Sequence, residues 1–361
     1  MSELTYRAAM IGCGRVTQHY VRILTKLDPV ERFKVVACCD LIPAKAQQVG
    51  AALGATPYTE AARMIAETKP DVVLVLTPSG LHFEHAQLAL NAGCHVLSEK
   101  PVSLIPEQAY QLAKLASQKG LYYGGVFQNR YNPAIRKLRE VMGSNRLGTI
   151  VSAAIRLRWC RTQDYYQDGW HGTWLMDGGV INQQAIHHID ALNWICGPIE
   201  SVCALTANRV NHLEAEDTMV ASLRFSDGSL GTIEVTTAAR PEDFEASLSV
   251  VGDGGMVQVG GIALNRIDIW RFVKPMEGDA DVPQKWSQEV PSGYGLGHGP
   301  LLRDWVVSLD AGAVEPPVPA LQAVKAVELV HALYTSVEQD GWVRLADNPR
   351  SKRLGHKARS T

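Results

Sequence analysis

A lysine and a histidine stand out in the sequence as side chains that can handle protons. Lys100, which precedes Pro101, follows the apolar run His95–Ser98, an expected parallel strand. Doubly wound sheets bind their ligands at the carboxyl ends of such strands. The imidazole of His187 titrates near neutrality and can therefore take up and return a proton. A Lys-Pro pair at a strand end is commonly only a solvated turn, so the assignment of Lys100 depends on its surroundings.

His187 lies in a segment, 182–196, whose pattern predicts one helix. The apolar face of this helix repeats at spacings of four, three and four residues: Ala185, Ile189, Leu192 and Cys196. On the other side, Gln183, His187 and Asp190 form a polar stripe that can face a cleft. His188 borders Leu192 and is interpreted as a structural residue.

Two pairs of histidines raise the question of a metal site. His82 and His85 are three residues apart, whereas His187 and His188 are adjacent. Adjacent residues on a helix diverge by about 100°, and no further cluster of ligands follows. We therefore expect no metal.

The start of the chain carries a pattern typical of dinucleotide binding. The expected strand Ala8–Ile11 runs into Gly12-Cys-Gly14, and a helix is expected to follow. Gly12 permits a tight turn, and Gly14 lets the backbone approach a pyrophosphate at the helix N-terminus. Thr17 replaces the third glycine of this fingerprint, but the second expected strand ends at Asp40. Its carboxylate can accept hydrogen bonds from ribose hydroxyls and would repel a 2′-phosphate. No arginine follows, so NAD is favoured over NADP. The alternative is an ordinary glycine turn beside a surface aspartate.

The pattern of elements changes near residue 148. Before it, short apolar runs alternate with amphipathic stretches, which predicts a parallel sheet covered by helices. After it, strand-like runs follow one another between Gly/Asp/Ser turns, which predicts a mostly antiparallel open sheet. The expected strands are 8–11, 34–39, 72–76, 95–98, 122–126, 150–161, 201–209, 218–225, 230–237, 246–251 and 256–259. The sequence thus predicts an α/β fold with an N-terminal Rossmann domain (1–126), a C-terminal α/β domain with a large open sheet (127–346) and a flexible basic tail (347–361).

The composition excludes several functional classes. Of 361 residues, 46% are hydrophobic and 20% charged, which is typical of a globular protein. The formal net charge of −2 gives no electrostatic drive toward nucleic acid or an anionic membrane. No apolar stretch is long enough to span a bilayer, and the first residues do not resemble a secretory signal. Seven cysteines without a CxxC motif fit reduced thiols in a cytoplasmic protein.

Several motifs resemble those of the glucose–fructose oxidoreductase/inositol dehydrogenase (Gfo/Idh/MocA) family. Thr77-Pro78-Ser-Gly-Leu-His82 resembles the TPxxxH turn after the family's fourth strand, and Glu99-Lys100-Pro101 resembles the EKP segment that ends its fifth. The resemblance covers nearly the whole chain, including 128–133 and 178–190. Within the family, segments 161–174, 214–217 and 293–298 are most similar to bacterial UDP-N-acetyl-2-amino-2-deoxy-D-glucuronate 3-dehydrogenases.

The resemblance implies hydride transfer from a sugar carbon to NAD. Such a reaction needs a base within reach of the sugar hydroxyl and a donor that controls the developing alkoxide. The resemblance assigns Lys100 to hold and polarise the hydroxyl, and His187 to exchange its proton. Many relatives carry an aspartate four residues before this histidine, where this chain has Gln183. An amide can orient the ring or bind substrate but supplies no negative charge, so Lys100 is assigned more firmly than His187.

The resemblance also predicts the residues that contact the cofactor, with His82 close to the nicotinamide. The expected set is Gly12, Gly14, Arg15, Val16, Asp40, Thr77, Pro78, His82, Glu99, Lys100, Gln128 and Trp170. The sequence leaves open whether the Lys100–Pro101 bond is cis.

Arginines near residue 160 are the first candidates for an anionic substrate. Arg156 and Arg158 share one strand face and are interpreted as solvated, whereas Arg161 has the opposite parity. It leads into Tyr165-Tyr166, and a guanidinium beside aromatic rings suits a carboxylate or diphosphate together with a sugar or uracil. His298, in a glycine-rich loop, is a further candidate. The expected substrate-binding residues are Lys100, Arg161, Tyr165, Tyr166, Gln183, His187 and His298.

The function expected from these features is the NAD-dependent oxidation of C3 of UDP-N-acetylglucosaminuronic acid during cell-surface polysaccharide synthesis. One alternative is oxidation or reduction of another sugar or inositol. Another is a non-catalytic NAD-binding regulator, which would lack the proton-handling pair. The resemblance suggests 2-oxoglutarate as a reoxidant of retained NAD. The open sheet predicts a homodimer or homotetramer.

Overall fold

The computed structural model describes residues 4–357 and divides the chain into two compact units. One unit runs to Phe127 and also includes His298–Val324; the other comprises Gln128–Gly297 and the chain from Lys325 onward. The second boundary falls inside α11 (Ala320–Gln339). The predicted boundary at 126/127 lies one residue before this division, whereas the predicted second domain is contiguous and here a late segment groups with the first unit.

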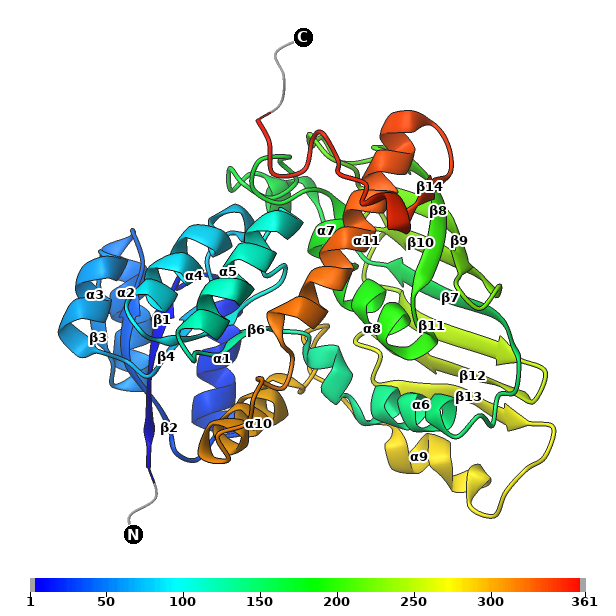
Figure 1. Cartoon of the computed structure of the whole chain (residues 1–361), viewed down its shortest axis with the longest axis horizontal. Coiled ribbons are helices and arrows are strands. Elements are labelled where there is room, and N and C mark those ends of the chain that lie inside the picture. The colour runs from blue at the N-terminus through cyan, green and yellow to red at the C-terminus, as the bar shows by residue number, and fades with distance from the viewer. Residues whose placement is uncertain (1–3, 358–361) are drawn as a thin grey trace. The chain divides into compact units, whose positions relative to one another are not determined.

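The first unit is a six-stranded parallel sheet in the order β3-β2-β1-β4-β5-β6 with helices on its faces (Figure 1). Its strands are β1 (Tyr6–Ile11), β2 (Phe33–Cys39), β3 (Thr56–Tyr58), β4 (Val72–Val75), β5 (His95–Ser98) and β6 (Tyr123–Gly125). Its helices are α1 (Arg15–Arg22), α2 (Pro43–Leu53), α3 (Ala61–Thr68), α4 (His82–Asn91), α5 (Pro106–Gln118) and α10 (His298–Asp310), and the first residues of α11 also belong to it. All four residues of β4 are buried, as a central strand covered on both faces requires. The order places the carboxyl ends of β1 and β4, where the chain reverses its direction across the sheet, beside each other.

The second unit is built on an eight-stranded sheet in the order β13-β12-β11-β7-β10-β9-β8-β14. Its strands are β7 (Ile150–Arg158), β8 (Ile199–Ala207), β9 (Thr218–Phe225), β10 (Leu230–Thr236), β11 (Glu245–Gly252), β12 (Gly255–Gly260), β13 (Arg266–Phe272) and β14 (Val343–Arg344). Its helices are α6 (Pro133–Gly143), α7 (Val180–Gln183), α8 (Ile186–Cys196) and α9 (Val282–Trp286), with the later part of α11. Only β7 and β10 run parallel, so the sheet is mostly antiparallel as predicted.

One face of this second sheet carries the helices α6, α8 and α11, and the other face is open in the chain (Figure 1). Leu205 of β8 pairs with Val220 of β9, and these side chains are 69% and 49% exposed. Apolar side chains exposed on paired strands leave a surface that another molecule can cover.

The expected basic tail is ordered through Lys357, in contrast to the prediction. Leu354 is fully buried, and the Ser351 hydroxyl donates to Glu338 Oε1 at 2.6 Å. Leu354 and Ser351 help to anchor this segment, and its almost wholly polar composition conceals such contacts. Residues 358–361 lie outside the described part of the chain.

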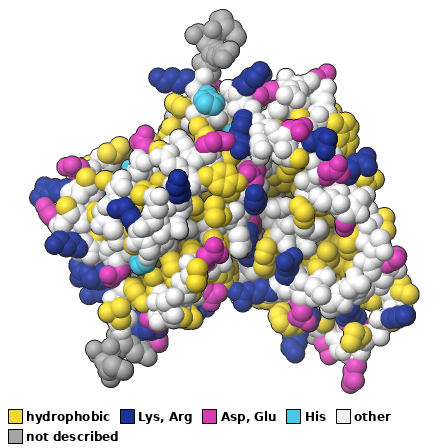
Figure 2. All heavy atoms as spheres, viewed as in Figure 1, with side chains coloured by type: hydrophobic (Ala, Val, Ile, Leu, Met, Phe, Trp, Pro, Cys, Tyr) yellow, Lys and Arg dark blue, Asp and Glu magenta, His cyan; other side chains and the backbone are white. Residues whose placement is uncertain are grey.

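Among residues 4–357, no helix is both long and apolar enough to cross a membrane. On the face drawn in Figure 2, basic and acidic side chains are interspersed rather than gathered into one patch of a single sign. This distribution agrees with the nearly neutral net charge.

Candidate active site

The turn between β1 and α1 has the geometry of a dinucleotide-binding loop. Gly12 has φ +97°, and a Cβ added there would lie 2.6 Å from the carbonyl oxygen of Leu76. A Cβ at Gly14 would meet no described atom within 4 Å, so the backbone is open there. The Thr17 hydroxyl donates to the Gly12 carbonyl at 2.7 Å and is buried, which explains how threonine serves in place of the third glycine. An open backbone at a helix N-terminus fits a pyrophosphate.

Asp40 lies directly after β2 and is held by two backbone donors. Its Oδ2 accepts the Cys13 N–H at 2.8 Å, and its Oδ1 accepts the Ile42 N–H at 2.9 Å. Each carboxylate oxygen retains a further lone pair for a ribose hydroxyl. The neighbouring Leu41 is 86% exposed and offers an apolar surface at the same edge. The first unit therefore fits NAD at both its pyrophosphate and its ribose positions.

His82 connects the two turns at the carboxyl ends of β4 and β5. Its Nδ1 lies 2.6 Å from the Pro101 carbonyl oxygen and its Nε2 lies 2.8 Å from that of Thr77. Burial lowers the pKa of His82. The two carbonyl contacts act to raise this pKa, but the effect of burial is larger. The ring is 1% exposed, so in this unit His82 supports the turns; its expected contact with the nicotinamide stays a prediction. The Lys100–Pro101 bond, which the sequence left open, is cis.

Glu99 lies buried beneath Lys100 in a cluster that the sequence did not predict. Its Oε1 accepts the Tyr20 hydroxyl at 3.0 Å and lies 3.7 Å from His298 Nε2. Its Oε2 accepts the backbone N–H of Lys100 at 3.2 Å. Glu99 is 5% exposed and His298 1% exposed, whereas Lys100 is half-buried. The structure thus places His298 against Glu99 inside the first unit; its expected contact with substrate has no support from this burial.

In the second unit, the predicted helix 182–196 is two helices. α7 ends at Gln183 and α8 begins at Ile186, so the expected continuous polar stripe is interrupted. Asp190 is also turned inward, because Arg130 donates to both of its oxygens at 2.6 and 2.8 Å with both side chains buried. His187 is half-buried and Gln183 is 8% exposed. The polar stripe therefore loses Asp190 to a buried ion pair, and His187 is the most accessible of its three members.

His188 is structural, as predicted. It is 1% exposed, its ring lies edge-on to Trp159 at 6.0 Å, and burial lowers its pKa to about 4. The predicted apolar face of this segment is also confirmed for Ala185, Ile189 and Leu192, which are fully buried.

Aromatic side chains gather between the end of β7 and α7. The rings of Tyr165 and Tyr166 meet edge-on at 5.1 Å, and Tyr165 also lies 4.2 Å from the His171 ring, which stacks on Trp170 at 3.6 Å. Gln184 Nε2 donates to the Tyr165 hydroxyl at 3.4 Å. These contacts bring the two predicted substrate tyrosines next to the segment that carries Gln183 and His187.

Arg161 joins this aromatic group and is already paired. Its Nη1 donates to Asp243 Oδ1 at 2.9 Å, and its guanidinium lies 5.8 Å from the centre of the Tyr165 ring. Arg158, in contrast, points to the open sheet face and pairs with Glu234 at 2.6 Å and Glu245 at 3.0 Å. Both Arg156 and Arg158 were interpreted as solvated; Arg156 is exposed, whereas Arg158 is half-buried and its carboxylate partners were not predicted.

The other predicted cofactor residues differ in exposure. In the first unit Arg15 is exposed, and Val16, Thr77 and Pro78 are half-buried. In the second unit Gln128 is 2% exposed and Trp170 is half-buried. Their contacts with NAD remain predictions.

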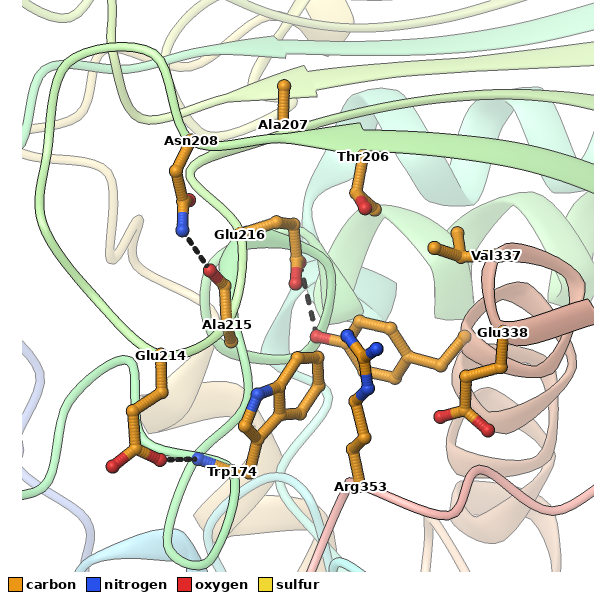
Figure 3. Close-up of a pocket in the computed structure, with 11 residues that line it drawn as sticks. Trp174, Thr206, Ala207, Asn208, Glu214, Ala215, Glu216, Val337, Glu338 and Arg353 are labelled. Atoms are coloured by element: carbon orange, nitrogen blue, oxygen red, sulfur yellow. Dashed lines mark hydrogen bonds between the residues drawn. The ribbon is translucent and has the colours of Figure 1, made fainter. Parts of the chain in front are cut away.

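A pocket of about 210 Å³ lies elsewhere in the second unit and contains none of the predicted site residues (Figure 3). Its walls include Trp174, Glu216 and Tyr334, and the Tyr334 hydroxyl donates to Glu216 Oε1 at 3.1 Å. Burial raises the pKa of Glu216 to about 8, so this carboxyl is held largely neutral at pH 7. We assign it to the packing of α7 against α11.

Two family models match the chain. Residues 6–125 match the oxidoreductase family model with an NAD-binding Rossmann fold, and residues 135–258 match the GFO/IDH/MocA C-terminal domain. The chain belongs to the Gfo/Idh/MocA oxidoreductase family. The expected family and fold class are thereby confirmed, as is an oxidoreductase with NAD as its cofactor.

Among solved structures, this family member is similar to two WlbA dehydrogenases determined with NADH and UDP-GlcNAcA. The protein from Bordetella pertussis is 33% identical, with a TM-score of 0.89 over 95% of this chain and 99% of that one. The protein from Chromobacterium violaceum is 32% identical, with a TM-score of 0.88 over 95% and 97%. D-glucoside 3-dehydrogenase of Escherichia coli is 30% identical over 66% of this chain and 72% of its own length. These relatives show that the Gfo/Idh/MocA chain is an NAD-binding sugar oxidoreductase.

Proposed function

We propose that the protein oxidises the C3 hydroxyl of UDP-N-acetylglucosaminuronic acid with NAD, in the synthesis of a cell-surface polysaccharide. The observation that carries this proposal is the likeness, over almost the full length of both chains, to two dehydrogenases bound to UDP-GlcNAcA and NADH. The E. coli relative, named for oxidation at position 3 of a glucoside, supports the choice of carbon.

The proposed chemistry divides between Lys100 and His187. NAD held by the Gly12–Gly14 turn and Asp40 would supply the acceptor for the hydride that leaves C3. The Lys100 ammonium donates to the C3 oxygen and stabilises the negative charge that develops there, and His187 takes the hydroxyl proton. The buried Glu99 accepts the Lys100 backbone N–H and fixes the turn that presents this side chain. His187→Asn should lower turnover, since asparagine cannot accept the proton.

A second candidate substrate is a glycoside or inositol without a nucleotide. The relatives named D-glucoside 3-dehydrogenase and inositol 2-dehydrogenase 3, the latter from Saccharopolyspora erythraea at 26% identity, favour it. NADH formation with UDP-GlcNAcA, UDP-GlcNAc, methyl glucoside and myo-inositol separates the candidates. The proposal expects turnover of the uronic acid well above the other three; turnover of inositol or glucoside alone would contradict it. A non-catalytic regulator would form no NADH with any of them.

The assembly and the fate of NADH belong to the same proposal. We expect a second copy of the chain to cover the open sheet face, giving a homodimer or homotetramer in the cytoplasm, because paired strands expose Leu205 and Val220 there. We also propose that 2-oxoglutarate reoxidises retained NADH. Mass measurement of the native protein and oxidation of bound NADH by 2-oxoglutarate test these two points.

A further inference from the structure

Two arginines meet where the parallel strands β7 and β10 end. Beyond the strands, the two segments of the chain continue side by side. The Arg161 N–H donates to the Thr237 carbonyl at 2.8 Å, and the Ala239 N–H donates to the Trp159 carbonyl at 3.1 Å. This pairing brings Arg161 and Arg240 to one corner of the second unit. The Tyr166 hydroxyl lies 2.7 Å from Thr237 Oγ1, so the corner adjoins the predicted substrate tyrosines.

The charge of Arg161 is largely balanced within the chain. Its Nη1 contacts Asp243 Oδ1 at 2.9 Å and the Cys160 carbonyl at 2.6 Å. Asp243 Oδ1 is itself held by the Cys160 N–H at 2.8 Å, which fixes the ion pair. An anion arriving at Arg161 would therefore meet a carboxylate as well as a guanidinium.

Arg240 is held in place by neutral acceptors instead. Its Nη1 donates to the carbonyls of Ala239 at 2.8 Å and Thr237 at 3.3 Å and approaches Cys160 Sγ at 3.7 Å. Its Nη2 donates to the Arg161 carbonyl at 3.1 Å and to Asn211 Oδ1 at 3.2 Å.

These contacts orient the exposed guanidinium without cancelling its charge. Within residues 4–357, no carboxylate lies within 4 Å of it, and its Nε–H makes no hydrogen bond. Because the side chain is already ordered, binding an anion costs less conformational entropy.

Space for a ligand lies next to Arg240. Asn211, which anchors its Nη2, also lines a pocket of about 210 Å³ formed by the loop 208–213. An ordered, uncompensated guanidinium beside a pocket suits a phosphate group carried by a larger ligand.

We propose that Arg240, rather than Arg161, is the principal cation for the diphosphate of a nucleotide-sugar substrate. This inference rests on the proposed function, since only a nucleotide-linked sugar carries that group. Arg161, balanced by Asp243, contributes hydrogen bonds rather than net charge.

Isothermal titration of the full-length, NAD-loaded protein with UDP tests the inference, because UDP has the diphosphate but no sugar carboxylate. Arg240→Gln should weaken UDP binding by roughly ten- to a hundredfold. Arg161→Gln should stay within about threefold of wild type. Arg271→Gln is the matched control, since Arg271 is exposed on β13, three places from β7 in the sheet, and should have no effect.

Asp243→Asn provides a test of opposite sign. It keeps an acceptor oxygen but removes the charge that balances Arg161, so UDP should bind roughly threefold tighter. If circular dichroism shows that Arg240→Gln is unfolded, the UDP affinities of two other variants decide the question. These are Asp243→Asn and Arg240→Lys, which keeps the positive charge but not the planar guanidinium.

The outcomes separate the inference from the proposed function. If the wild-type protein turns over UDP-GlcNAcA but Arg240→Gln binds UDP as tightly as wild type, the inference is overturned and the proposed function stands. An equal loss of UDP affinity in Arg161→Gln and Arg240→Gln also overturns the inference. So does a changed native mass of Arg240→Gln with unchanged UDP affinity, which would make the corner a subunit contact. Wild-type protein that oxidises a glucoside but binds no UDP overturns both.

Discussion

His298 Nε2 lies 3.7 Å from Glu99 Oε1, with both side chains buried and the two residues 199 positions apart in the chain. α10 begins at His298 and returns to the Rossmann unit to make this contact. Burial acts to raise the pKa of Glu99. The interactions with His298, Lys100 and Tyr20 together lower this pKa by more than burial raises it, so the net pKa is below the ordinary value. Glu99 is therefore an ionised, fixed carboxylate directly beneath the turn that carries Lys100, and we expect His298 to influence Lys100 through it.

His298→Leu should lower turnover roughly tenfold while NAD affinity changes by less than a few-fold, because losing a contact to a buried charge costs about 1.5–3 kcal/mol. Initial rates and NAD titration measure the two effects. His298→Gln keeps an N–H donor and should restore much of the rate. Equal rates for both variants would show that only the volume of the side chain matters.

Lys100→Ala should reduce turnover by at least ~10²-fold with NAD affinity within a few-fold, since a positioned proton-handling group contributes about 10²–10⁴-fold. NADH absorbance gives the rate, and fluorescence titration of NADH gives the affinity. Lys119→Ala, at the end of α5, is the matched control and should keep the wild-type rate. Turnover near wild type in Lys100→Ala would remove this residue from the mechanism.

Asp40→Ala combined with Leu41→Arg should shift cofactor preference toward NADP. The change removes a carboxylate that would repel a 2′-phosphate and adds a guanidinium at a side chain that is 86% exposed. The ratio of kcat/KM for NAD and NADP measures the shift, with Leu41→Gln as the control. Wild-type protein that already prefers NADP would contradict the assignment of Asp40.

His188 should make the folded protein sensitive to acid. Its folded-state pKa of about 4 lies below the ordinary value near 6.5, so the stability it contributes is present above pH 6.5 and lost as the pH falls toward 4. At about 1.4 kcal/mol per pH unit, this amounts to roughly 3 kcal/mol. Thermal melts between these pH values should show a flatter profile for His188→Phe than for wild type. His356→Phe, at an exposed position, should follow wild type.

The sequence predicted best what local pattern determines. The strands His95–Ser98 and Thr218–Phe225 match their predicted bounds, because apolar runs between turns define them. The short strand β3 was not predicted, because its Thr-Pro-Tyr sequence has no buried side chain and no alternation of apolar residues. Asp190 was misplaced because helical spacing cannot reveal a partner 60 positions away, and the Glu99–His298 contact was missed for the same reason. The pairing of β7 with both of its neighbours, β10 and β11, brings Arg240 to Arg161.

The sugar carboxylate gives the last prediction. If the substrate is the uronic acid, wild-type protein should bind UDP-GlcNAcA more tightly than the neutral UDP-GlcNAc, because only the former offers a carboxylate to a fixed cation. We expect Arg161 to bind the sugar carboxylate and so to distinguish the two ligands. It lies beside Tyr165, and its Nε and Nη2 make no hydrogen bond within residues 4–357. Asp243 balances its charge, so the contribution should be that of ordinary hydrogen bonds, about 0.5–1.5 kcal/mol, or roughly two- to tenfold. Titration of both ligands into wild type and Arg161→Ala should show the preference shrinking by that factor while UDP-GlcNAc affinity changes little. If both ligands weaken together and the preference survives, Arg161 contacts the diphosphate instead.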